Sequence, residues 1–372
     1  MEVALEMQPC CGNQTGIGVY TCQLAKRLIP SDGIAYRGNV FDFMGRNHSI
    51  SMQDTFPFPI VENRLLPYGV YRRIWNGLPF NYGQLFGGDA DVTHFFNFVV
   101  PPKIRGAVIS TIHDMTYIRY PETVAKRNLH RLQAGMAYTI ERSDMIVTVS
   151  EFSKMEIMEL CNVPERSIVV IPSAATPERF TCDREGLFNR LGITKPYILF
   201  VGTLEPRKNL VRLLKAFDHL SEKHHGNIQL VLCGGMGWKN EEILKTLKEI
   251  KHKANVILSG YLSTIERNTL YANAAVFAFV SIYEGFGTPL LEAMFWGIPI
   301  VSANTASMPE VAGSAACYVD PFSVDSIENG LCHVIEDSAY AASLVACGQQ
   351  RFQCFSWDKS AEKLKNLYKL FL

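Results

Sequence analysis

Short apolar runs of strand length alternate with stretches of helical periodicity along most of the chain. In the first half, runs at 3–7, 107–112 and 145–149 have this strand character, and a helical pattern covers about 122–142. Parallel strands need long crossover connections, which are usually helices. The alternation therefore predicts an α/β fold built on doubly wound parallel sheets.

The alternation pauses once and then restarts. Residues 172–177, Pro-Ser-Ala-Ala-Thr-Pro, form a linker-like stretch, and an apolar run at 197–201 opens the second series. At 372 residues, of which 48% are hydrophobic, the chain is long enough to form two cores. We therefore predict one domain over 1–178 and a second over 179–356.

Charge and cysteine usage exclude several classes of protein. The 36 basic and 36 acidic residues balance and are spread over both halves, so no basic surface for nucleic acid is expected. The first residues lack the basic and apolar segments of a signal peptide, and no apolar run approaches about 18 residues. The ten cysteines show no C-x-x-C spacing. We expect a cytoplasmic protein with free thiols and no bound metal.

The stretch with the most candidate ligand-binding groups is 283–294, Tyr-Glu-Gly-Phe-Gly-Thr-Pro-Leu-Leu-Glu-Ala-Met. It follows a strand-like run at 276–280, and its apolar spacing predicts a helix with Thr288 as N-cap. Glu284 leaves the strand beside two glycines, and Glu292 lies about one turn into the helix. The stretch predicts two carboxylates and a row of backbone amides at the carboxyl end of one strand.

Such an edge suits a polyhydroxylated or phosphorylated ligand. Carboxylates accept paired hydroxyl donors, and the first amides of a helix lack partners within the helix and can bind oxygens. The alternative is that the glycines shape a turn and the acids complement the helix dipole.

A second anion site is predicted at 202–209, Gly-Thr-Leu-Glu-Pro-Arg-Lys-Asn, which follows the strand at 197–201. Arg207 and Lys208 stand before a helix, and two cations at a helix N-terminus oppose its dipole. A bound phosphate would turn this penalty into attraction. A solvated charge pair is the alternative.

Two first-domain features carry weaker signals. His113 and Asp114 follow the strand at 107–112, where parallel sheets bind ligands, although a packed core histidine is the alternative. Gly16 and Gly18 lie in a glycine-rich loop between a strand and a helix, which allows a phosphate or sugar to approach or simply shapes the turn. Thr21 stands where a dinucleotide fingerprint would have its third glycine.

Residues 56–75 mix arginines with aromatic residues. This composition is typical of a partly packed surface segment. It also suits contact with an anionic membrane surface or a lipid-linked acceptor, and the sequence leaves both interpretations open.

Together, these motifs resemble retaining glycosyltransferase family 4, which has the GT-B fold. The most specific feature is the pair Glu284 and Glu292 with seven residues between them. The sequence of 202–209 is most similar to that of α-mannosyltransferases that build bacterial O-antigen-type polysaccharides. The motifs occur in the family's order over nearly the whole chain: Gly16-Ile17-Gly18, His113-Asp114, Gly202 to Asn209, Glu284 to Glu292 and Ser307 to Val311.

The resemblance implies two Rossmann-like domains facing across a cleft, with a C-terminal helix at 357–372 that crosses back to the first. The second domain would bind the donor, with Glu292 on the ribose and Arg207 and Lys208 on the diphosphate. Many relatives have arginine where this chain has Thr203, so the leaving group would depend on the two cations here. The implied catalytic residues are His113, Glu284, Lys208 and Arg207, and the other implied donor contacts are Gly16, Gly18, Glu292 and the amides of Phe286, Gly287 and Thr288.

The implied reaction is retaining transfer of a hexose onto a glycan or lipid-linked glycan in cell-surface polysaccharide synthesis. Mannose from GDP-mannose is the first expectation, and a UDP-sugar-dependent glucosyl or N-acetylhexosaminyl transferase is the alternative. The nucleotide-sugar is a substrate, so no cofactor is expected. The location would be the cytoplasm or the inner face of the cell membrane.

Three other classes fit parts of the pattern. A glycoside hydrolase would also use two carboxylates, but a neutral glycoside gives Arg207 and Lys208 no role. A nicotinamide oxidoreductase fits the sheets but lacks the glycine fingerprint. A sugar-nucleotide sensor would keep the same site without turnover, and an assay separates it from an enzyme.

Overall fold

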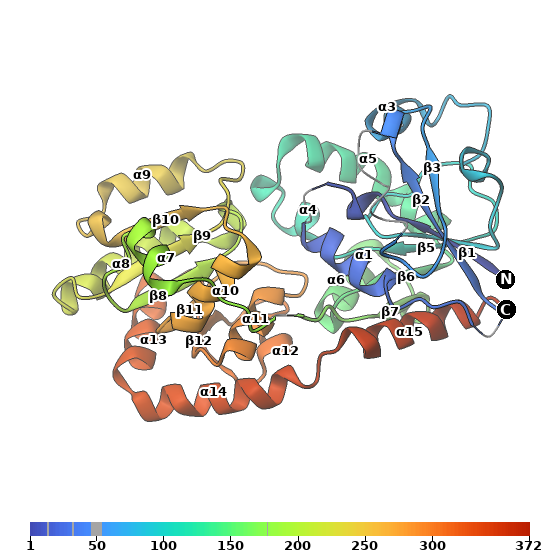
Figure 1. Ribbon diagram of the computed structural model, residues 1–372. Helices are drawn as coiled ribbons and strands as arrows, with labels where there is room; N and C mark the ends of the chain where they lie inside the picture. Colours follow the sequence, from blue (N-terminus) through green and yellow to red (C-terminus); the bar gives the residue numbers. More distant parts are fainter. Residues whose placement is uncertain (13–14, 32, 46–53, 177) are drawn as a thin grey trace. The chain divides into compact units, whose positions relative to one another are not determined.

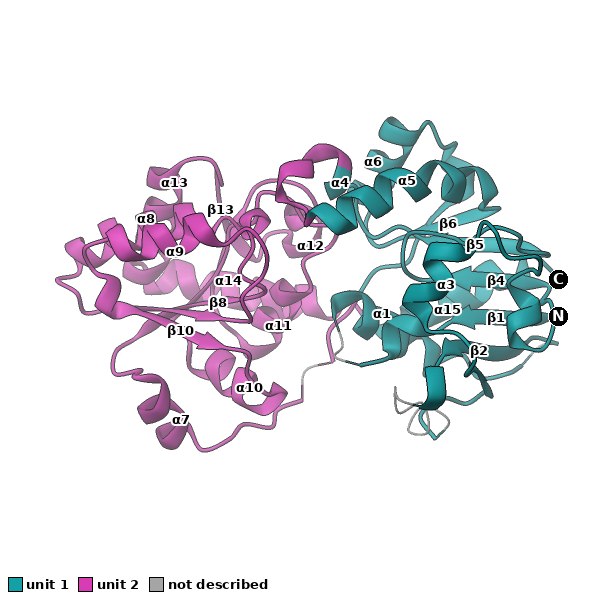
Figure 2. Ribbon diagram, turned by 90° about the horizontal axis from the view of Figure 1, so that it is seen from above, with its two compact units in different colours: residues 1–117, 126–173, 356–372 teal, residues 118–125, 174–355 magenta. Residues whose placement is uncertain are grey.

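The computed structural model describes residues 1–12, 15–31, 33–45, 54–176 and 178–372. They form two compact units, described separately below (Figure 2). Unit 1 comprises residues 1–117, 126–173 and 356–372, and unit 2 comprises residues 118–125 and 174–355.

Unit 1 is built on a parallel sheet of seven strands in the order β3-β2-β1-β4-β5-β6-β7 (Figure 1). The chain winds outward in one direction from β1 and in the other from β4, so the topological switch point lies between these two strands. Its elements are β1 (Glu2–Glu6), α1 (Gly16–Ala25), β2 (Ala35–Phe41), β3 (Ile60–Asn63), α3 (Tyr68–Ile74), β4 (Val92–Phe95), β5 (Ala107–Thr111), α5 (Lys126–Arg142), β6 (Met145–Thr148), α6 (Glu151–Cys161), β7 (Ile168–Val170) and α15 (Trp357–Lys369), with α4 (Thr116–Arg119) at the boundary of the units.

Unit 2 has a parallel sheet of six strands in the order β10-β9-β8-β11-β12-β13. Its switch point lies between β8 and β11. Its elements are α7 (Arg184–Leu191), β8 (Tyr197–Val201), α8 (Leu210–Lys223), β9 (Gln229–Cys233), α9 (Glu241–Glu249), β10 (Val256–Gly260), α10 (Thr264–Asn273), β11 (Val276–Phe279), α11 (Thr288–Trp296), β12 (Ile300–Ala303), α12 (Met308–Ala312), β13 (Ala316–Val319), α13 (Val324–Glu336) and α14 (Ser338–Phe352).

The central strands of unit 2 are buried on both faces, which explains their continuous apolar sequences. Ile198 and Phe200 of β8 belong to the core that α8 and α13 cover. On the neighbouring strand β11, the ring of Phe277 packs instead against Tyr271 of α10, with 5.5 Å between ring centroids. The two helix layers therefore fix both faces of the strands whose ends carry the candidate site.

Helix α15 ends unit 1 and is held there by a buried polar contact. The Tyr368 hydroxyl lies 2.7 Å from Nδ1 of His94 on β4, and Nε2 of the same ring lies 2.8 Å from the Thr111 hydroxyl. Burial lowers the pKa of His94 to about 3, so the ring is neutral near pH 7. At the other end of α15, the ring of Trp357 packs against Tyr20 of α1.

We predict that Tyr368→Phe lowers the free energy of unfolding by about 1–3 kcal/mol, because it leaves Nδ1 of the buried His94 without a partner. Urea unfolding followed by circular dichroism measures this change. Tyr138→Phe on the exposed side of α5 is the matched control and should change stability by less than about 0.5 kcal/mol. Equal stability of the two variants would contradict a stabilising role for the contact.

Two local expectations are wrong. Ser153, with Glu156 three residues later, has the sequence pattern of a capping box and predicts an N-cap at Ser153. The N-cap of helix α6 is instead Ser150, whose side chain accepts a hydrogen bond from the backbone N–H of Ser153. The cysteines are also not all thiols in this structure, since Cys10 and Cys22 form a disulfide across the connection from β1 to α1. These two cysteines have a sequence separation of 12, and the fold alone brings them together.

Candidate active site

The candidate site lies at the carboxyl edge of the unit 2 sheet, where β8 and β11 are neighbours. Strand β8 leads into the loop 202–209, and β11 leads into the loop 280–287. Open α/β sheets bind ligands at such a switch point, because the chain leaves the two strands in opposite directions and opens a crevice.

Glycines end three neighbouring strands at this edge. Gly202 follows β8 with φ 155°, Gly234 follows β9 with φ 152°, and Gly260 ends β10 with φ 69°. A Cβ atom at Gly234 would lie 2.0 Å from the carbonyl oxygen of Gly202. A larger residue at Gly234 therefore cannot be accommodated, because these two loops approach each other so closely.

A cluster of four charged side chains joins the loops after β8 and β11. Lys208 Nζ lies 2.5 Å from Glu284 Oε1, and Arg207 Nη1 lies 2.6 Å from Glu284 Oε2. Arg207 Nη2 also contacts Glu205 Oε1 at 2.8 Å. One carboxylate, Glu284, thus bridges both cations, and the formal charges of the cluster cancel.

In this cluster, side chains of the protein itself neutralise Arg207 and Lys208. The sequence favoured a bound phosphate as the counter-charge for two cations at a helix N-terminus, with a solvated charge pair as the alternative. In the structure both cations lie in a 3₁₀ turn, Pro206–Lys208, ahead of helix α8, and the chain supplies its own anions from Glu205 and Glu284. The presence of a phosphate therefore does not follow from charge balance alone.

The cluster is nearly closed to water, with side-chain exposures of 12% for Lys208 and 10% for Glu284. Burial alone would raise the pKa of Glu284, but Arg207 and Lys208 outweigh it and hold that pKa at about 2. Burial, followed by the charge of Arg207, lowers the pKa of Lys208. Glu284 is therefore an anion at neutral pH, fixed next to the two cations Arg207 and Lys208.

Hydrogen bonds to backbone carbonyl groups hold the loops after β8 and β11 together. The Asn209 side-chain amide donates to the Val280 carbonyl at 3.0 Å, and the Ile282 N–H donates to the Arg207 carbonyl at 3.0 Å. The buried Ser307 hydroxyl lies 2.9 Å from the Glu284 carbonyl. Sequence reasoning assigned no role to Asn209 or Ser307. Both lie within motifs on which the family resemblance rests, and that location was the feature of the sequence that could have indicated a role for them.

Helix α11 begins one residue earlier than expected. Its N-cap is Gly287, with φ 95°, and Thr288 is its first helical residue rather than its cap. The left-handed conformation of Gly287 explains the difference, because glycine adopts it without strain. The helix ends at Trp296, and Gly297 caps it with φ 68°. Phe286, just ahead of the helix, packs its ring against Phe355.

Glu292 lies on α11 with partners of its own. Its Oε2 accepts a hydrogen bond from the Tyr271 hydroxyl at 2.7 Å, and its Oε1 lies 3.4 Å from Arg267 Nη2. Both partners come from α10, which begins with a capping box between Ser263 and Glu266. The structure therefore gives Glu284 and Glu292 different cationic partners at the same sheet edge.

Comparison with known proteins identifies the family. Residues 15–179 match the model for Glycosyltransferase Family 4, and residues 183–351 match the model for glycosyl transferases group 1. The chain belongs to glycosyltransferase family 4. The second match contains the whole charged cluster.

Similar proteins support this assignment. O-antigen chain mannosyltransferase B of Escherichia coli is 29% identical, and the match covers 100% of both chains. A GDP-mannose-dependent α-(1-6)-phosphatidylinositol monomannoside mannosyltransferase of Mycobacterium tuberculosis is 24% identical over 72% of this chain and 71% of that one. Among solved structures, Anabaena HepE in complex with UDP-glucose has a TM-score of 0.73 at 16% identity and covers 99% of each chain. This likeness shows the shared fold, in which each chain has two Rossmann-like units, the GT-B architecture.

In this glycosyltransferase, His113 lies in unit 1, two residues after β5. Its Nε2 lies 2.8 Å from the Phe96 carbonyl, and its ring packs edge-on against Tyr20 of α1. Burial lowers the pKa of His113, so the ring is neutral. A carbonyl can only accept, so Nε2 carries the hydrogen and Nδ1 is left as an acceptor. Asp114 caps the next turn, because its Oδ1 accepts a hydrogen bond from the Thr116 N–H at 2.9 Å.

The two glycines of unit 1 lie inside a helix rather than in the loop before it. Helix α1 begins at Gly16, and Thr15 is its N-cap, whose side chain accepts from the Gly18 N–H at 3.4 Å. A Cβ atom at Gly16 would meet no atom of the described residues within 4 Å, and its φ is not positive. The described fold therefore does not require glycine at this position of the glycosyltransferase.

We predict that Gly16→Ala leaves the free energy of unfolding unchanged or raises it by up to about 1 kcal/mol, because alanine restricts the unfolded chain. The same change should lower kcat/KM about tenfold, or ~1.4 kcal/mol, if substrate approaches this backbone. Gly77→Ala, where a Cβ atom would make an ordinary contact of 3.6 Å with the Ile74 carbonyl, is the control for activity. Full activity of Gly16→Ala would remove Gly16 from the site.

Proposed function

We propose that this chain transfers mannose from GDP-mannose to a glycan or lipid-linked glycan acceptor in cell-surface polysaccharide synthesis, with retention of the anomeric configuration. The observation that carries the proposal is the buried cluster of Arg207, Lys208 and Glu284 at the switch point of unit 2. The choice of mannose rests on the names of the similar proteins, among them an O-antigen mannosyltransferase and a GDP-mannose-dependent mannosyltransferase.

The cluster suits the charge changes of this reaction. When the bond between the anomeric carbon and the diphosphate oxygen breaks, negative charge grows on the diphosphate and positive charge on the sugar ring. Lys208 and Arg207 can stabilise the first, and the Glu284 carboxylate, 2.5–2.6 Å from both, can hold sugar hydroxyls beside them. The three groups are fixed before the donor arrives, so little reorganisation is needed during the reaction.

Retention follows when the acceptor attacks from the face that the diphosphate leaves. The acceptor oxygen forms the new bond to the anomeric carbon, and its proton passes to the departing phosphate oxygen. No protein base is needed for this step. We place Nδ1 of His113 as an acceptor for a donor-sugar hydroxyl, Glu292 on the ribose, and the amides near Gly16 and Gly18 against the donor.

A UDP-sugar-dependent glucosyl or N-acetylhexosaminyl transferase is the second candidate. One structure of the same fold, Anabaena HepE, is in complex with UDP-glucose. Base and sugar are selected by small differences in shape, which a shared fold does not fix.

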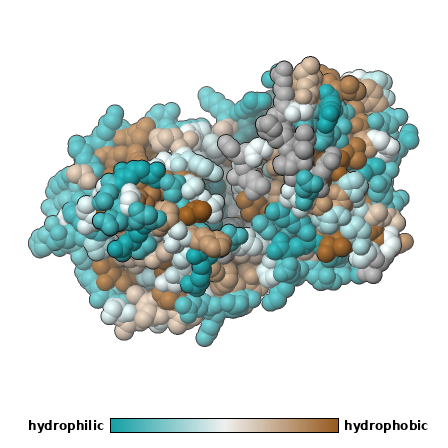
Figure 3. Space-filling model, in the orientation of Figure 1, coloured by the Kyte–Doolittle hydropathy of each residue, from teal (hydrophilic) through white to brown (hydrophobic). Residues whose placement is uncertain are grey.

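Among the described residues, no helix is both long and apolar enough to cross a membrane. On the face shown in Figure 3, hydrophilic and hydrophobic residues are interspersed. Around helix α3, the side chains of Leu65, Val70 and Ile74 are exposed, next to Arg72 and Arg73. We propose that this segment contacts the inner membrane surface or the lipid of the acceptor. Flotation with anionic vesicles tests this, and failure of the wild type to float would contradict it.

The proposed activity is tested with purified protein, a mannose-terminated oligosaccharide acceptor and either GDP-mannose or UDP-glucose. We expect GDP release that depends on the acceptor, an α-linked product by NMR, and the same rate with and without added Mg²⁺ or Mn²⁺. Release of UDP instead of GDP would favour the second candidate. Free mannose produced without an acceptor would indicate a hydrolase, and binding without turnover would indicate a sensor.

A further inference from the structure

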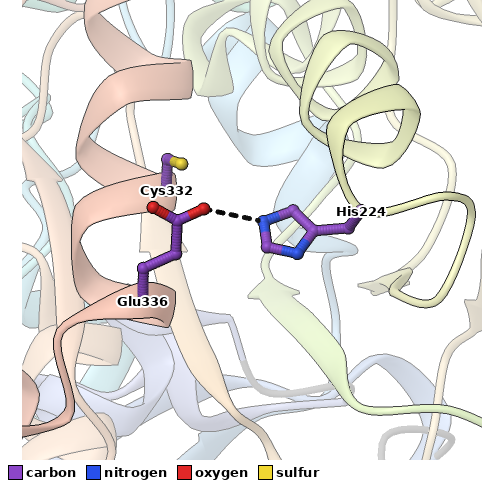
Figure 4. Close-up of side chains that lie close together, drawn as sticks. All are labelled: His224, Cys332 and Glu336. Atoms are coloured by element: carbon purple, nitrogen blue, oxygen red, sulfur yellow. Dashed lines mark ion pairs between the residues drawn. The ribbon is translucent and has the colours of Figure 1, made fainter.

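Helices α8 and α13 pack against each other on one face of the unit 2 sheet. Near their C-terminal ends, three side chains with different donor atoms come together: His224, which caps α8, and Cys332 and Glu336 on the last turns of α13 (Figure 4). None of them belongs to the loops that carry the candidate active site.

The spacing of these side chains suits a single ion. Cys332 and Glu336 are four residues apart on a helix, so they share one face. The possible ligand atoms of all three residues lie within 4.8 Å of one another, and His224 Nε2 lies 3.5 Å from Glu336 Oε1. Ligand atoms in a tetrahedral zinc site lie about 3.3–3.6 Å apart, given metal–ligand distances of ~2.0–2.3 Å. Small rotations of the side chains would therefore complete the site.

One possible ligand atom of the group lacks a hydrogen bond. His224 Nε2 is buried and forms no hydrogen bond within the part of the chain that the structure describes, although Glu336 is near enough for an ion pair. A buried nitrogen without a partner is costly. A neighbouring group on the same two helices differs in charge, because the Lys223 cation lies 2.5 Å from Glu328 and already neutralises it.

We propose that His224, Cys332 and Glu336 bind a zinc ion, with water as the fourth ligand. The combination of imidazole and thiol favours Zn²⁺ over Mg²⁺ or Ca²⁺, which take oxygen ligands. The ion ties the end of α8 to α13, and α8 begins directly after Lys208 and Asn209. The site is structural in this proposal, and it stands whether or not the proposed donor is correct.

The test uses the full chain, stripped with a chelator under reducing conditions and then mixed with Zn²⁺ alone. We expect one zinc ion per chain after desalting and a higher melting temperature. Cobalt(II) in place of zinc should give the near-ultraviolet charge-transfer band of a thiolate ligand. Cys332→Ser should abolish this band and weaken zinc binding by about 100-fold or more, because losing a ligand costs at least as much as losing its supporting contacts.

Two control variants separate this site from others. Cys354→Ser removes an exposed thiol elsewhere, and His219→Gln alters the neighbouring group, so both should bind zinc like the wild type. His224→Gln is the second test variant if Cys332→Ser fails to fold, which its melting curve without metal reveals. Failure of the wild type to retain zinc, unchanged binding by the folded test variants, or loss of binding in Cys354→Ser would each overturn the proposal.

Discussion

Replacing Lys208 by alanine should lower kcat by about 100-fold or more, with a smaller change in KM. Lys208 is held 2.5 Å from Glu284 and is 12% exposed, so its charge acts in a site that excludes most water. Removing one preorganised group that stabilises charge in the transition state typically costs ~10²–10³ in kcat. Initial rates over a range of donor concentrations, at saturating acceptor, separate the two parameters.

Lys215→Ala is the matched control, since this lysine is exposed on the same helix, α8. Its kinetic parameters should equal those of the wild type. The melting temperature of Lys208→Ala should show that it is folded at the assay temperature. A folded Lys208→Ala with unchanged kcat would remove Lys208 from the catalytic set.

Glu284→Gln should both abolish most activity and destabilise unit 2. Its carboxylate bridges Arg207 and Lys208, and removing one partner of a buried ion pair costs ~3–5 kcal/mol because a charge is left uncompensated. Arg207 keeps Glu205 as a partner, so we expect about 3 kcal/mol. Urea unfolding at pH 7 measures the loss, and Glu249→Gln, at an exposed position on α9, is the control.

The same residue predicts a pH dependence. The pKa of Glu284 is lowered from 4.5 to about 2 in the folded chain, so the unfolded chain binds more protons between these values. Stability from this group is complete above pH 4.5 and is lost as pH falls toward 2, by ~1.4 kcal/mol per unit of pKa difference. The wild type should therefore approach Glu284→Gln in stability over this range. A constant difference between them from pH 5 to pH 2.5 would contradict the ion-paired geometry.

Much of the fold could be predicted because the apolar pattern is strong where strands are buried on both faces. The strands predicted at 107–112, 145–149 and 197–201 agree with β5, β6 and β8. Periodicity was weaker for short edge elements, and β3 and β13 were not predicted. Between 122 and 142, one expected helix is a 3₁₀ turn followed by α5, which begins at Lys126.

The candidate site was harder to predict than the sheet that carries it. Sequence placed Arg207, Lys208 and Glu284 at strand ends that the sheet order makes neighbours. It did not predict that Glu284 would pair with both cations, because that contact spans more than 70 residues of sequence. The same limit applies to Tyr271, whose contact with Glu292 depends on how α10 packs against α11. Pairing across the sheet edge comes from tertiary structure, which local patterns do not encode.

The most direct test of the account is thermal unfolding of the wild type and Lys208→Ala with GDP, UDP or ADP, each at about 100 times a micromolar Kd. A ligand that binds the folded chain should add ~2.7 kcal/mol of stability at that excess. We predict a clear rise in melting temperature with GDP, a smaller rise in Lys208→Ala, and little change with UDP or ADP. A shift with UDP alone would move the assignment to a UDP-sugar donor. If no nucleotide raises the melting temperature of the wild type, the donor site assigned to Arg207, Lys208 and Glu292 is contradicted.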